Sequence, residues 1–536
     1  MLIYRSLSLS LSLSLSLPLC ALAGMDRRRL ACFCSCDARA RRGRRAGLPL
    51  CVLAMTLAAP AFAQRDPNVQ PRDLGVGNGA SNRAVWEPAV AAGGGFAVTV
   101  FHAPTIGVKY AVYDVSAEDW VFEGATGTGN PGLHDPSIAY NSITGEFVAC
   151  ARSARAVWTN VFTPSADPND PAGSWAGWVR QKLGDDTPSM DKPWIIAGEM
   201  TQDVQEFYIV LHAPMSYLRT ITGGYTEDDW GYSKVFLNGN PSLTLPNETG
   251  FAFPAVWADG EFYVCYRDWT DDNEIHLLVG QDFNPADPNN FDPNEAGVTF
   301  SVMEKQCGLG PLGGQEPVPV IIETNRRNFN DVLPGDFGEG NAKSCPQLVA
   351  DPTDADRLLL VYHDVADPNS TDVNIYLHEL TRDSGKWCAS ERILVNNDAT
   401  FFESDQWAPS MTIDDQGYVH IIFYDDRDFT DPNDPNDGDQ QPDSTAPSST
   451  KYNVYYAWAP VDNLDFSSEQ RNLDLFASPP EVAYDGSLSA FDPHEYNGIT
   501  WLGDVVFATY AGTWEADTQP NESAILSSRI IWHDAP

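Results

Sequence analysis

The stretch Asp191-Lys-Pro-Trp-Ile-Ile-Ala197 decides the fold, because six other stretches of the chain open in a similar way. Each places a proline or polar residues directly before a short apolar run. A recurring unit of this kind predicts one repeat fold in place of several unrelated domains. The openings are EPAVAA at Glu87, DPSIAY at Asp135, DKPWIIA at Asp191, FPAVWA at Phe253, CPQLVA at Cys345, APSMTI at Ala408 and a degenerate DPHEYNGITW at Asp492.

Each opening is followed by a turn and by a second run rich in Val, Phe and Tyr, such as EFYIVLH ending at His212. A third run and a polar turn that usually ends on an aromatic residue, such as Trp120 or Trp387, complete the unit. Short alternating runs between turns predict strands. The chain is therefore predicted to be all-β, a β-propeller of four-stranded blades. Seven openings favour seven blades, and six remain the alternative if the last opening only completes the first blade.

Seven openings are separated by only six outer-strand turns, so one outer strand is missing from the repeats. The segment from Leu74 to Val76 is expected to supply it by pairing with the C-terminal strands around Ile525 to Trp532, which would close the ring and cover the sheet edges. The proline of each opening is expected at the first residue of a strand, where its missing N–H removes no ladder hydrogen bond.

Residues 1–63 are unlike the rest of the chain. Basic residues at Arg27–Arg29 and Arg39–Arg45 precede an apolar run at Leu50–Leu57 and the small-x-small sequence Ala61-Phe-Ala63, which is typical of an export signal. We expect cleavage near Ala63 and a single propeller domain over residues 64–536, secreted, periplasmic or on the cell surface. No later stretch is long and apolar enough to span a bilayer.

The chain is strongly acidic, with a net charge of -41, and removing the nine arginines and two aspartates of residues 1–63 makes it -48. Such a surface repels nucleic acid and anionic lipid. Beyond residue 63, Cys307 and Cys345 bracket a Gly-rich insertion and form a candidate disulfide. Cys150 and Cys265 lie in apolar runs and are expected as buried free thiols. Cys388 has no evident partner.

In a four-stranded meander the ends of the second strands and the starts of the first strands share one face, called here the top face. Insertions at residues 301–344 and 428–450 fall on the same face by this count and are expected to wall a pocket. Polar residues gather at these strand ends. The candidate site residues are the acids Glu87, Asp135, Asp191 and Asp425, the cations Arg152, Lys192, Arg267 and Arg427, and the histidines His102, His212 and His363.

The sequence resembles the sialidase-like propellers, also called the BNR or Asp-box superfamily, and within them uncharacterised exported bacterial members. Thr381-x-Asp383-x-Gly385-x-Trp387 is similar to the Asp-box turn with one residue fewer, and Ser165-x-Asp167 with Gly173-Ser-Trp175 looks like an expanded copy. The resemblance implies an arginine triad that binds a carboxylate, an Asp acid/base and a Tyr–Glu nucleophile. The Arg-Ile-Pro motif that supplies the family's first arginine is absent, and no Tyr–Glu pair can be assigned.

Each group of candidates has two readings. The arginines either converge on a carboxylate or pair with local acids such as Asp268 and Asp426. The histidines either meet at a metal or stay hydrogen-bonded in separate blades, and no metal is predicted. The acids either include the carboxylate pair of a glycosidase, whose separation decides between retention and inversion, or cap strand-entry amides. The loop Asp431–Asp443 is a candidate calcium site, although its spacing fails the EF-hand pattern, and no other cofactor is expected.

The sequence contains no Gly-x-Ser-x-Gly elbow, no P-loop and no His-Glu-x-x-His motif, which argues against nucleotide-dependent and zinc-protease chemistry. The first functional prediction is an exported glycoside hydrolase with its site on the top face. The alternative is a noncatalytic propeller that binds a glycan or protein at the cell surface. The partner in either case is an extracellular glycan or glycoprotein, and the oligomeric state stays open.

Overall fold

The computed structural model describes residues 67–73 and, with gaps, residues 86–532; the longest gaps are 182–190, 235–248, 282–298, 304–320, 326–345, 426–452, 475–496 and 513–523. The chain divides into a segment, Met1–Phe62, that lies outside the described residues, and a compact unit, Ala63–Pro536. The described part is all-β, as predicted, and has no helix. It therefore also contains no helix that is long and apolar enough to cross a membrane.

The described strands form seven antiparallel sheets, numbered here in chain order. Sheet 1 contains β2 (Trp86–Gly93), β3 (Phe96–Ala103), β4 (Gly107–Asp114) and β5 (Asp119–Ala125); sheet 2 contains β6 (His134–Tyr140), β7 (Phe147–Ser153), β8 (Ala156–Thr163), β9 (Ser174–Trp175) and β10 (Val179–Arg180); sheet 3 contains β11 (Asp191–Thr201), β12 (Val204–His212), β13 (Ser216–Thr220) and β14 (Trp230–Lys234).

The remaining sheets repeat this order, with the first strand of each unit at one edge. Sheet 4 contains β15 (Thr249–Val256), β16 (Phe262–Asp268), β17 (Glu274–Gln281), β18 (Thr299–Val302) and β19 (Ile321–Glu323); sheet 5 contains β20 (Gln347–Ala350), β21 (Arg357–Val365), β22 (Val373–Asp383), β23 (Lys386–Ala389) and β24 (Ile393–Leu394); sheet 6 contains β25 (Gln406–Ile413), β26 (Tyr418–Asp425), β27 (Asn453–Pro460) and β28 (Asn472–Asp474); sheet 7 contains β29 (Gly498–Leu502), β30 (Val505–Gly512), β31 (Ala524–Trp532) and β1 (Pro67–Asp73).

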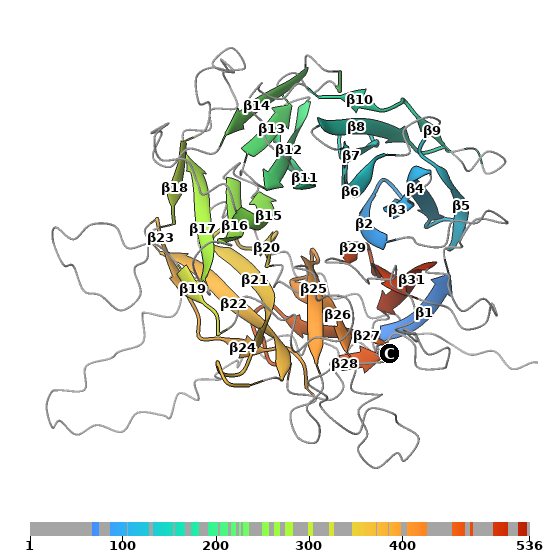
Figure 1. The fold of residues 1–536 in the computed structure, drawn as a ribbon. Coiled ribbons are helices and arrows are strands. Elements are labelled where there is room, and N and C mark those ends of the chain that lie inside the picture. Colours follow the sequence, from blue (N-terminus) through green and yellow to red (C-terminus); the bar gives the residue numbers. More distant parts are fainter. Residues whose placement is uncertain are drawn as a thin grey trace, which may run out of the picture. The chain divides into compact units, whose positions relative to one another are not determined.

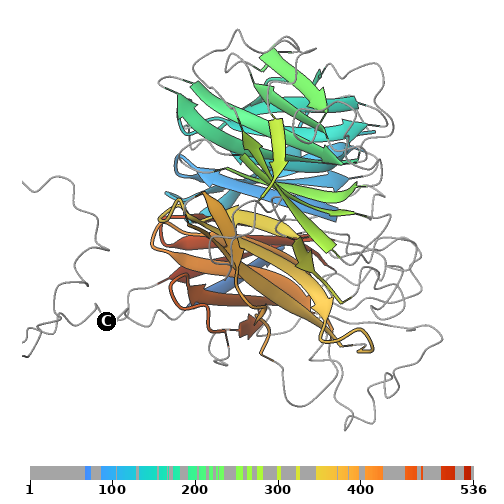
Figure 2. The same cartoon turned by 90° about the vertical axis from the view of Figure 1, so that its left-hand side faces the viewer.

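The first strands of neighbouring sheets contact one another in chain order, from β2 through β6, β11, β15, β20 and β25 to β29, and β29 contacts β2 (Figure 1). Figure 2 gives a second view of the same sheets, in which the strands of each sheet lie side by side. A series of small antiparallel sheets that contact through their first strands is propeller-like.

An N-terminal strand joins the C-terminal sheet, as expected, but it lies earlier in the chain. β1 pairs antiparallel with β31, from Pro67 opposite Trp532 to Asp73 opposite Leu526. The predicted strand near Leu74 to Val76 lies outside the described residues. The pairing gives β31 a partner on the side away from β30.

The prolines of five repeated openings do not start their strands, so that expectation is corrected for five sheets. β2, β6, β11 and β25 each begin before the proline, and the proline and the residue preceding it form a β-bulge without a paired partner. A bulge tolerates proline because its N–H is not needed there. In β15 the bulge falls earlier, between Gly250 and Phe253, and Pro254 is paired with Val264.

The residue before the proline adopts a left-handed backbone in these four bulges. The φ angles are 57° at Glu87, 52° at Asp135, 44° at Lys192 and 49° at Ala408. A non-glycine residue in this region costs of order 1 kcal/mol or more and persists only where the surroundings fix it. Three of these four positions are candidate site residues, so the bulge sets the backbone that carries them.

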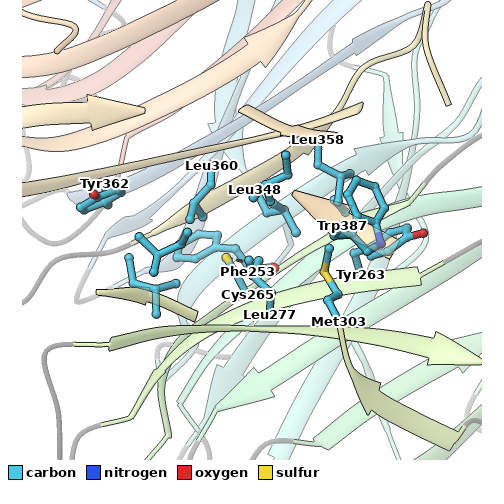
Figure 3. Packing of buried hydrophobic residues seen from close by; sticks show 14 of the residues in the cluster. Phe253, Tyr263, Cys265, Leu277, Met303, Leu348, Leu358, Leu360, Tyr362 and Trp387 are labelled. Carbon is cyan, nitrogen blue, oxygen red and sulfur yellow. Dashed lines mark hydrogen bonds between the residues drawn. The ribbon is translucent and has the colours of Figure 1, made fainter. Parts of the chain in front are cut away.

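Apolar side chains fill the space between neighbouring sheets. Between sheets 4 and 5, Phe253, Tyr263 and Leu277 pack against Leu348 and Leu360 (Figure 3). Similar cores lie between sheets 1 and 2, 2 and 3, 5 and 6, and 7 and 1. Strands buried on both faces read as continuous apolar runs, which is why the second strands are so rich in Val, Phe and Tyr.

Side-chain hydrogen bonds also link first strands across sheet boundaries. The N–H of Ile195 donates to Ser137 Oγ at 3.2 Å, and the N–H of Met411 donates to Gln347 Oε1 at 3.1 Å. Ser137 and Gln347 each follow the proline of their opening, so the two bonds occupy equivalent places in the repeat. Each satisfies a buried backbone donor at the border of two sheets.

The outer strand is interrupted in three sheets, which corrects the position of one predicted insertion. β9 and β10 both pair with β8, β18 and β19 both pair with β17, and β23 and β24 both pair with β22. Ser301 and Val302 belong to β18, and β18 and β19 are two parts of the outer strand of sheet 4. The insertion predicted at residues 301–344 therefore includes the end of the first part and all of the second. The second insertion, 428–450, lies outside the described residues between β26 and β27.

The described cysteines agree with the predictions in two cases of three. Cys150 and Cys265 are free and fully buried, as expected, and they occupy equivalent positions in β7 and β16. Cys388, for which no partner was evident from the sequence, is disulfide-bonded to a partner outside the described residues. The candidate pair Cys307 and Cys345 also lies outside them.

Candidate functional site

The register of the strands places the start of each first strand beside the end of the second strand, as predicted for the top face. Trp86 lies opposite His102, His134 opposite Arg152, and Asp191 opposite His212. The bulges lie next to these pairs. The top edge therefore presents a strained backbone and polar side chains together in sheets 1 to 3.

Glu87 and Asp135 meet across the boundary between sheets 1 and 2. Both are buried, with 4% and 3% of their surface exposed. The backbone N–H of Asp135 donates to Glu87 Oε2 at 3.2 Å, and the two carboxyl groups also share a hydrogen bond. Burial, the charge of Asp135 and this hydrogen bond raise the pKa of Glu87 well above its ordinary value. Glu87 is thus the protonated member of the pair.

Asp135 is the ionised member. Burial alone would raise its pKa, but the hydrogen bond from Glu87 and the positive charges of Lys192 and Arg152 outweigh burial and lower the pKa. Arg152 Nε forms an ion pair with Asp135 Oδ2. Lys192 comes from the bulge of β11 in sheet 3, so three sheets contribute to one cluster. We call Glu87, Asp135, Arg152 and Lys192 the Glu87–Asp135 site.

Two histidines border this site. The rings of His102 and His134 lie 5.6 Å apart between centroids, at an interplanar angle of 33°. Burial, followed by the neighbouring imidazole of His134, lowers the pKa of His102 to about 4. His102 is therefore neutral near pH 7, and its ring adds no charge to the cluster.

The cations of the site are more exposed than the acids. The side chain of Arg152 is 21% exposed, against 4% for that of Asp135. Lys192 and His134 are also partly exposed. The solvent side of the site is therefore basic, and the carboxyl groups lie beneath it.

The distance between the acids bears on glycoside chemistry. The two carboxyl groups of a retaining glycosidase lie about 5 Å apart, and those of an inverting enzyme lie farther apart. Glu87 and Asp135 are in hydrogen-bond contact, which is closer than either arrangement. A pair that shares one proton resembles the dyad in which two adjacent carboxyl groups do not both ionise.

A second polar cluster lies at the boundary of sheets 4 and 5. Arg267 is 1% exposed, and its Nη2 donates to Thr324 Oγ1 at 3.1 Å. Burial and the charge of Arg267 lower the pKa of His363 to about 3. Asp364, beside His363, accepts from the N–H of Asn325 at 2.8 Å. Arg267 is fully buried in this cluster, whereas the side chain of Arg152 reaches solvent.

The other candidates fall in different places. Asp425 is fully buried at the end of β26, opposite Gln406 and Asn453. Asp191 and His212 pair through their backbones in sheet 3, and nothing is described of their side chains. Arg427 lies outside the described residues. The candidate calcium loop, Asp431–Asp443, also lies outside them, and no group of metal-binding side chains occurs among the residues that the structure describes.

Sequence reasoning did not identify the roles of His134 and Thr324. His134 precedes Asp135 in the opening, and its ring lies beside that of His102 from the neighbouring sheet. Thr324 follows β19, inside a segment predicted to be an insertion, and no local signal marks it as a partner of Arg267. Both contacts depend on residues far apart in the chain.

No family model matches the chain, and no curated protein matches it. Solved structures do. AofleA from Arthrobotrys oligospora is 10% identical, with a TM-score of 0.38, over 78% of this chain and 92% of that chain. A polysaccharide lyase described as a PL25 ulvan lyase is 8% identical, with a TM-score of 0.41, over 83% of this chain and 93% of that chain. A mutant Trypanosoma rangeli sialidase with trans-sialidase activity is 10% identical, with a TM-score of 0.36, over 68% of this chain and 58% of that chain. These values lie below the level at which residue roles or activities can be carried from one protein to another.

Proposed function

We propose that residues 64–536 form an exported seven-bladed propeller, closed by β1, that binds acidic saccharides of extracellular glycans at the Glu87–Asp135 site. The observation that supports this most strongly is the grouping of two partly exposed cations, Arg152 and Lys192, around one ionised acid. With Glu87 protonated, these four groups carry a net charge of +1.

A basic group of this kind is unusual for a chain with a net charge of -41. The guanidinium fork suits carboxylate and sulfate groups, and an ammonium group adds a strongly hydrated positive charge. The acidic remainder of the surface would repel polyanions from other faces, so binding would be confined to this site. The protein's glycan partners would then be those that carry uronate, sialate or sulfate groups.

The raised pKa of Glu87 supports glycoside hydrolysis as a second candidate function. A carboxylic acid whose pKa is raised above its ordinary value can act as the proton donor to the oxygen of a leaving group. Asp135 is too close to act as the second carboxylate, so a hydrolase would need another acid. Asp191 is the first residue of β11 and directly precedes Lys192. It is therefore the candidate for the second carboxylate that lies nearest to a residue of the site in the sequence.

The experiment that tests the proposed binding function is a glycan array probed with purified Gln64–Pro536, with acidic glycans and their neutral counterparts side by side. Lys192→Gln should weaken binding of the acidic glycans at least tenfold. Lys386→Gln is the matched control, because it removes the same charge from an exposed position in a different sheet. Lys386 lies in β23 of sheet 5, at the turn that connects β22 to β23. Equal binding of the acidic and neutral glycans would contradict the assignment of binding to the Glu87–Asp135 site. An equal loss of binding in Lys192→Gln and Lys386→Gln would contradict it as well.

A panel of fluorogenic glycosides tests the second candidate. Hydrolysis that requires the proton of Glu87 should fall by orders of magnitude in Glu87→Gln, whereas binding of acidic glycans should persist. Release that is unchanged in this variant would exclude Glu87 as the proton donor.

A further inference from the structure

Glu87 occupies an unusual position for an acid, because it is buried at the base of a site that is basic on its solvent side. It lies in a bulge with a φ of 57°, so its backbone is fixed against neighbouring strands. Its carboxyl group is held by Asp135, through the backbone N–H and the side chain. Its protonation state therefore acts on Asp135 directly.

The charged and titratable groups around Glu87 come from four strands. β6 supplies His134 and Asp135, β7 supplies Arg152, β11 supplies Lys192 and β3 supplies His102. On its other side, β2 contacts β29, β30 and β31. Their described titratable groups are Tyr510, which bonds to Ser528, and Arg529, which bonds to Tyr113 and to the carbonyl of Glu118.

The site has two charge states that differ by one proton on Glu87. In the protonated state, Glu87 donates to Asp135, and Asp135 carries the one negative charge among the four groups of the site. In the ionised state, two carboxylates in contact would repel each other and draw both Arg152 and Lys192 toward them. The four groups would then carry a net charge of 0, and an incoming anion would have to compete with Glu87 for the same cations.

We infer that Glu87 is a specificity-determining residue of the proposed saccharide site: while it shares its proton with Asp135, the site carries a net positive charge that favours an acidic saccharide, and loss of that proton makes the site reject anions. This inference rests on the proposed function of the same site. Glu87 acts through Asp135 and the two cations, and it is therefore a positioning residue.

The direction of the pH dependence follows from these charges. Affinity for an anion should be highest while Glu87 is protonated and should fall as the pH rises through its pKa, which lies above that of an ordinary glutamate. A neutral saccharide should show no such change. A sulfate group stays ionised over the whole range, so a pH effect on a sulfated probe must come from the protein.

The test is a calorimetric titration of Gln64–Pro536 with a sulfated dextran oligosaccharide between pH 5 and pH 9, with unsulfated dextran as the control. The wild type should lose at least tenfold in affinity as the pH rises. Glu87→Gln, which keeps a neutral donor beside Asp135, should retain the low-pH affinity throughout. Parallel pH profiles in the two proteins would overturn the inference and leave the proposed binding function standing. No binding of the sulfated probe at any pH would overturn both.

A second measurement needs no variant. Above the pKa of Glu87, binding of the anion should be accompanied by uptake of a proton, which appears as a dependence of the binding enthalpy on the ionisation enthalpy of the buffer. Glu87→Gln should show no uptake under the same conditions. Tight binding by the wild type without proton uptake at any pH tested would contradict the inference.

Discussion

Arg152 in β7 forms an ion pair with Asp135 in β6, next to the bulge that carries Asp135. Asp135 is buried, so its charge depends on this partner, on Lys192 and on the proton of Glu87. Arg152→Met keeps most of the apolar stem and removes the charge. We expect a loss of roughly 2 to 3 kcal/mol in the free energy of unfolding, because a buried carboxylate loses its closest cation.

Asp135→Asn in the Arg152→Met background supplies the control for this prediction. Neutralising the buried acid should recover most of the lost stability, measured by urea unfolding at pH 7. Losses that simply add in the double variant would show that Arg152 contributes packing and not charge.

The two buried histidines predict a loss of stability in acid. Burial lowers the pKa of His102 to about 4 and that of His363 to about 3, whereas an unfolded histidine titrates near 6.5. Between these values the unfolded chain binds protons that the folded chain does not bind. The free energy of unfolding should therefore fall as the pH drops from about 6.5 toward 4.

His363→Gln isolates one of these histidines. Its unfolding free energy should depend less steeply on pH between 4 and 6, by up to about 1.4 kcal/mol per pH unit. Tyr424→Phe is the matched control: Tyr424 has the equivalent place in sheet 6, where its hydroxyl bonds to the N–H and carbonyl of Ala511 at 3.2 Å. That variant should lose stability without a change of slope. An unchanged slope in His363→Gln would mean that His363 is protonated in the folded state.

The equivalent thiols of Cys150 and Cys265 should resist alkylation in the folded protein. Their Sγ atoms donate to the carbonyls of Pro193 and Pro346 in the next sheets, at 3.7 and 3.6 Å, and burial raises the pKa of both thiols. Iodoacetamide followed by peptide mass spectrometry should find neither residue modified at pH 8 and both modified in denaturant. Modification of either thiol in the folded state would show that its sheet boundary opens.

Ala408 gives a direct measure of the strain in the bulges. Its φ of 49° disfavours any residue with a Cβ, and its side chain has no polar role. Ala408→Gly should raise the free energy of unfolding by on the order of 1 kcal/mol, because glycine adopts this conformation without a steric cost. Ala457→Gly, in the buried strand β27, should lower it by a similar amount. A loss of stability in Ala408→Gly would show that the bulge is not strained.

The all-β class and the sharing of an edge by the strand ends were predictable, because alternation and turn residues are local signals. The repeated openings each contribute to the first strand of a sheet, and His102, Arg152 and His212 lie opposite the strand starts as expected. The N-terminal strand was predicted to pair with the C-terminal strands, and it does so. The prediction placed it too late in the chain, because the segment that forms it, Pro67–Asp73, has no alternating pattern.

The site itself was only partly predictable. Glu87 and Asp135 are 48 residues apart, and their contact depends on how two bulges face each other across a sheet boundary. The left-handed conformation of a residue before proline has no sequence signal of its own, since only the surrounding sheets impose it. Arg152 and Arg267 look equivalent in the sequence, yet one reaches solvent and the other is fully buried beside Thr324.

The most direct test of the proposed binding function is the affinity of Gln64–Pro536 for a galacturonate oligosaccharide and for its carboxyl-reduced counterpart, measured at pH 5.5 with the wild type and with Lys192→Gln. The wild type should bind the acidic sugar at least tenfold more tightly than the neutral one, and Lys192→Gln should lose most of that preference. Equal affinity of the wild type for the two sugars, or a preference that survives in Lys192→Gln, would contradict the assignment of acidic-saccharide binding to the Glu87–Asp135 site.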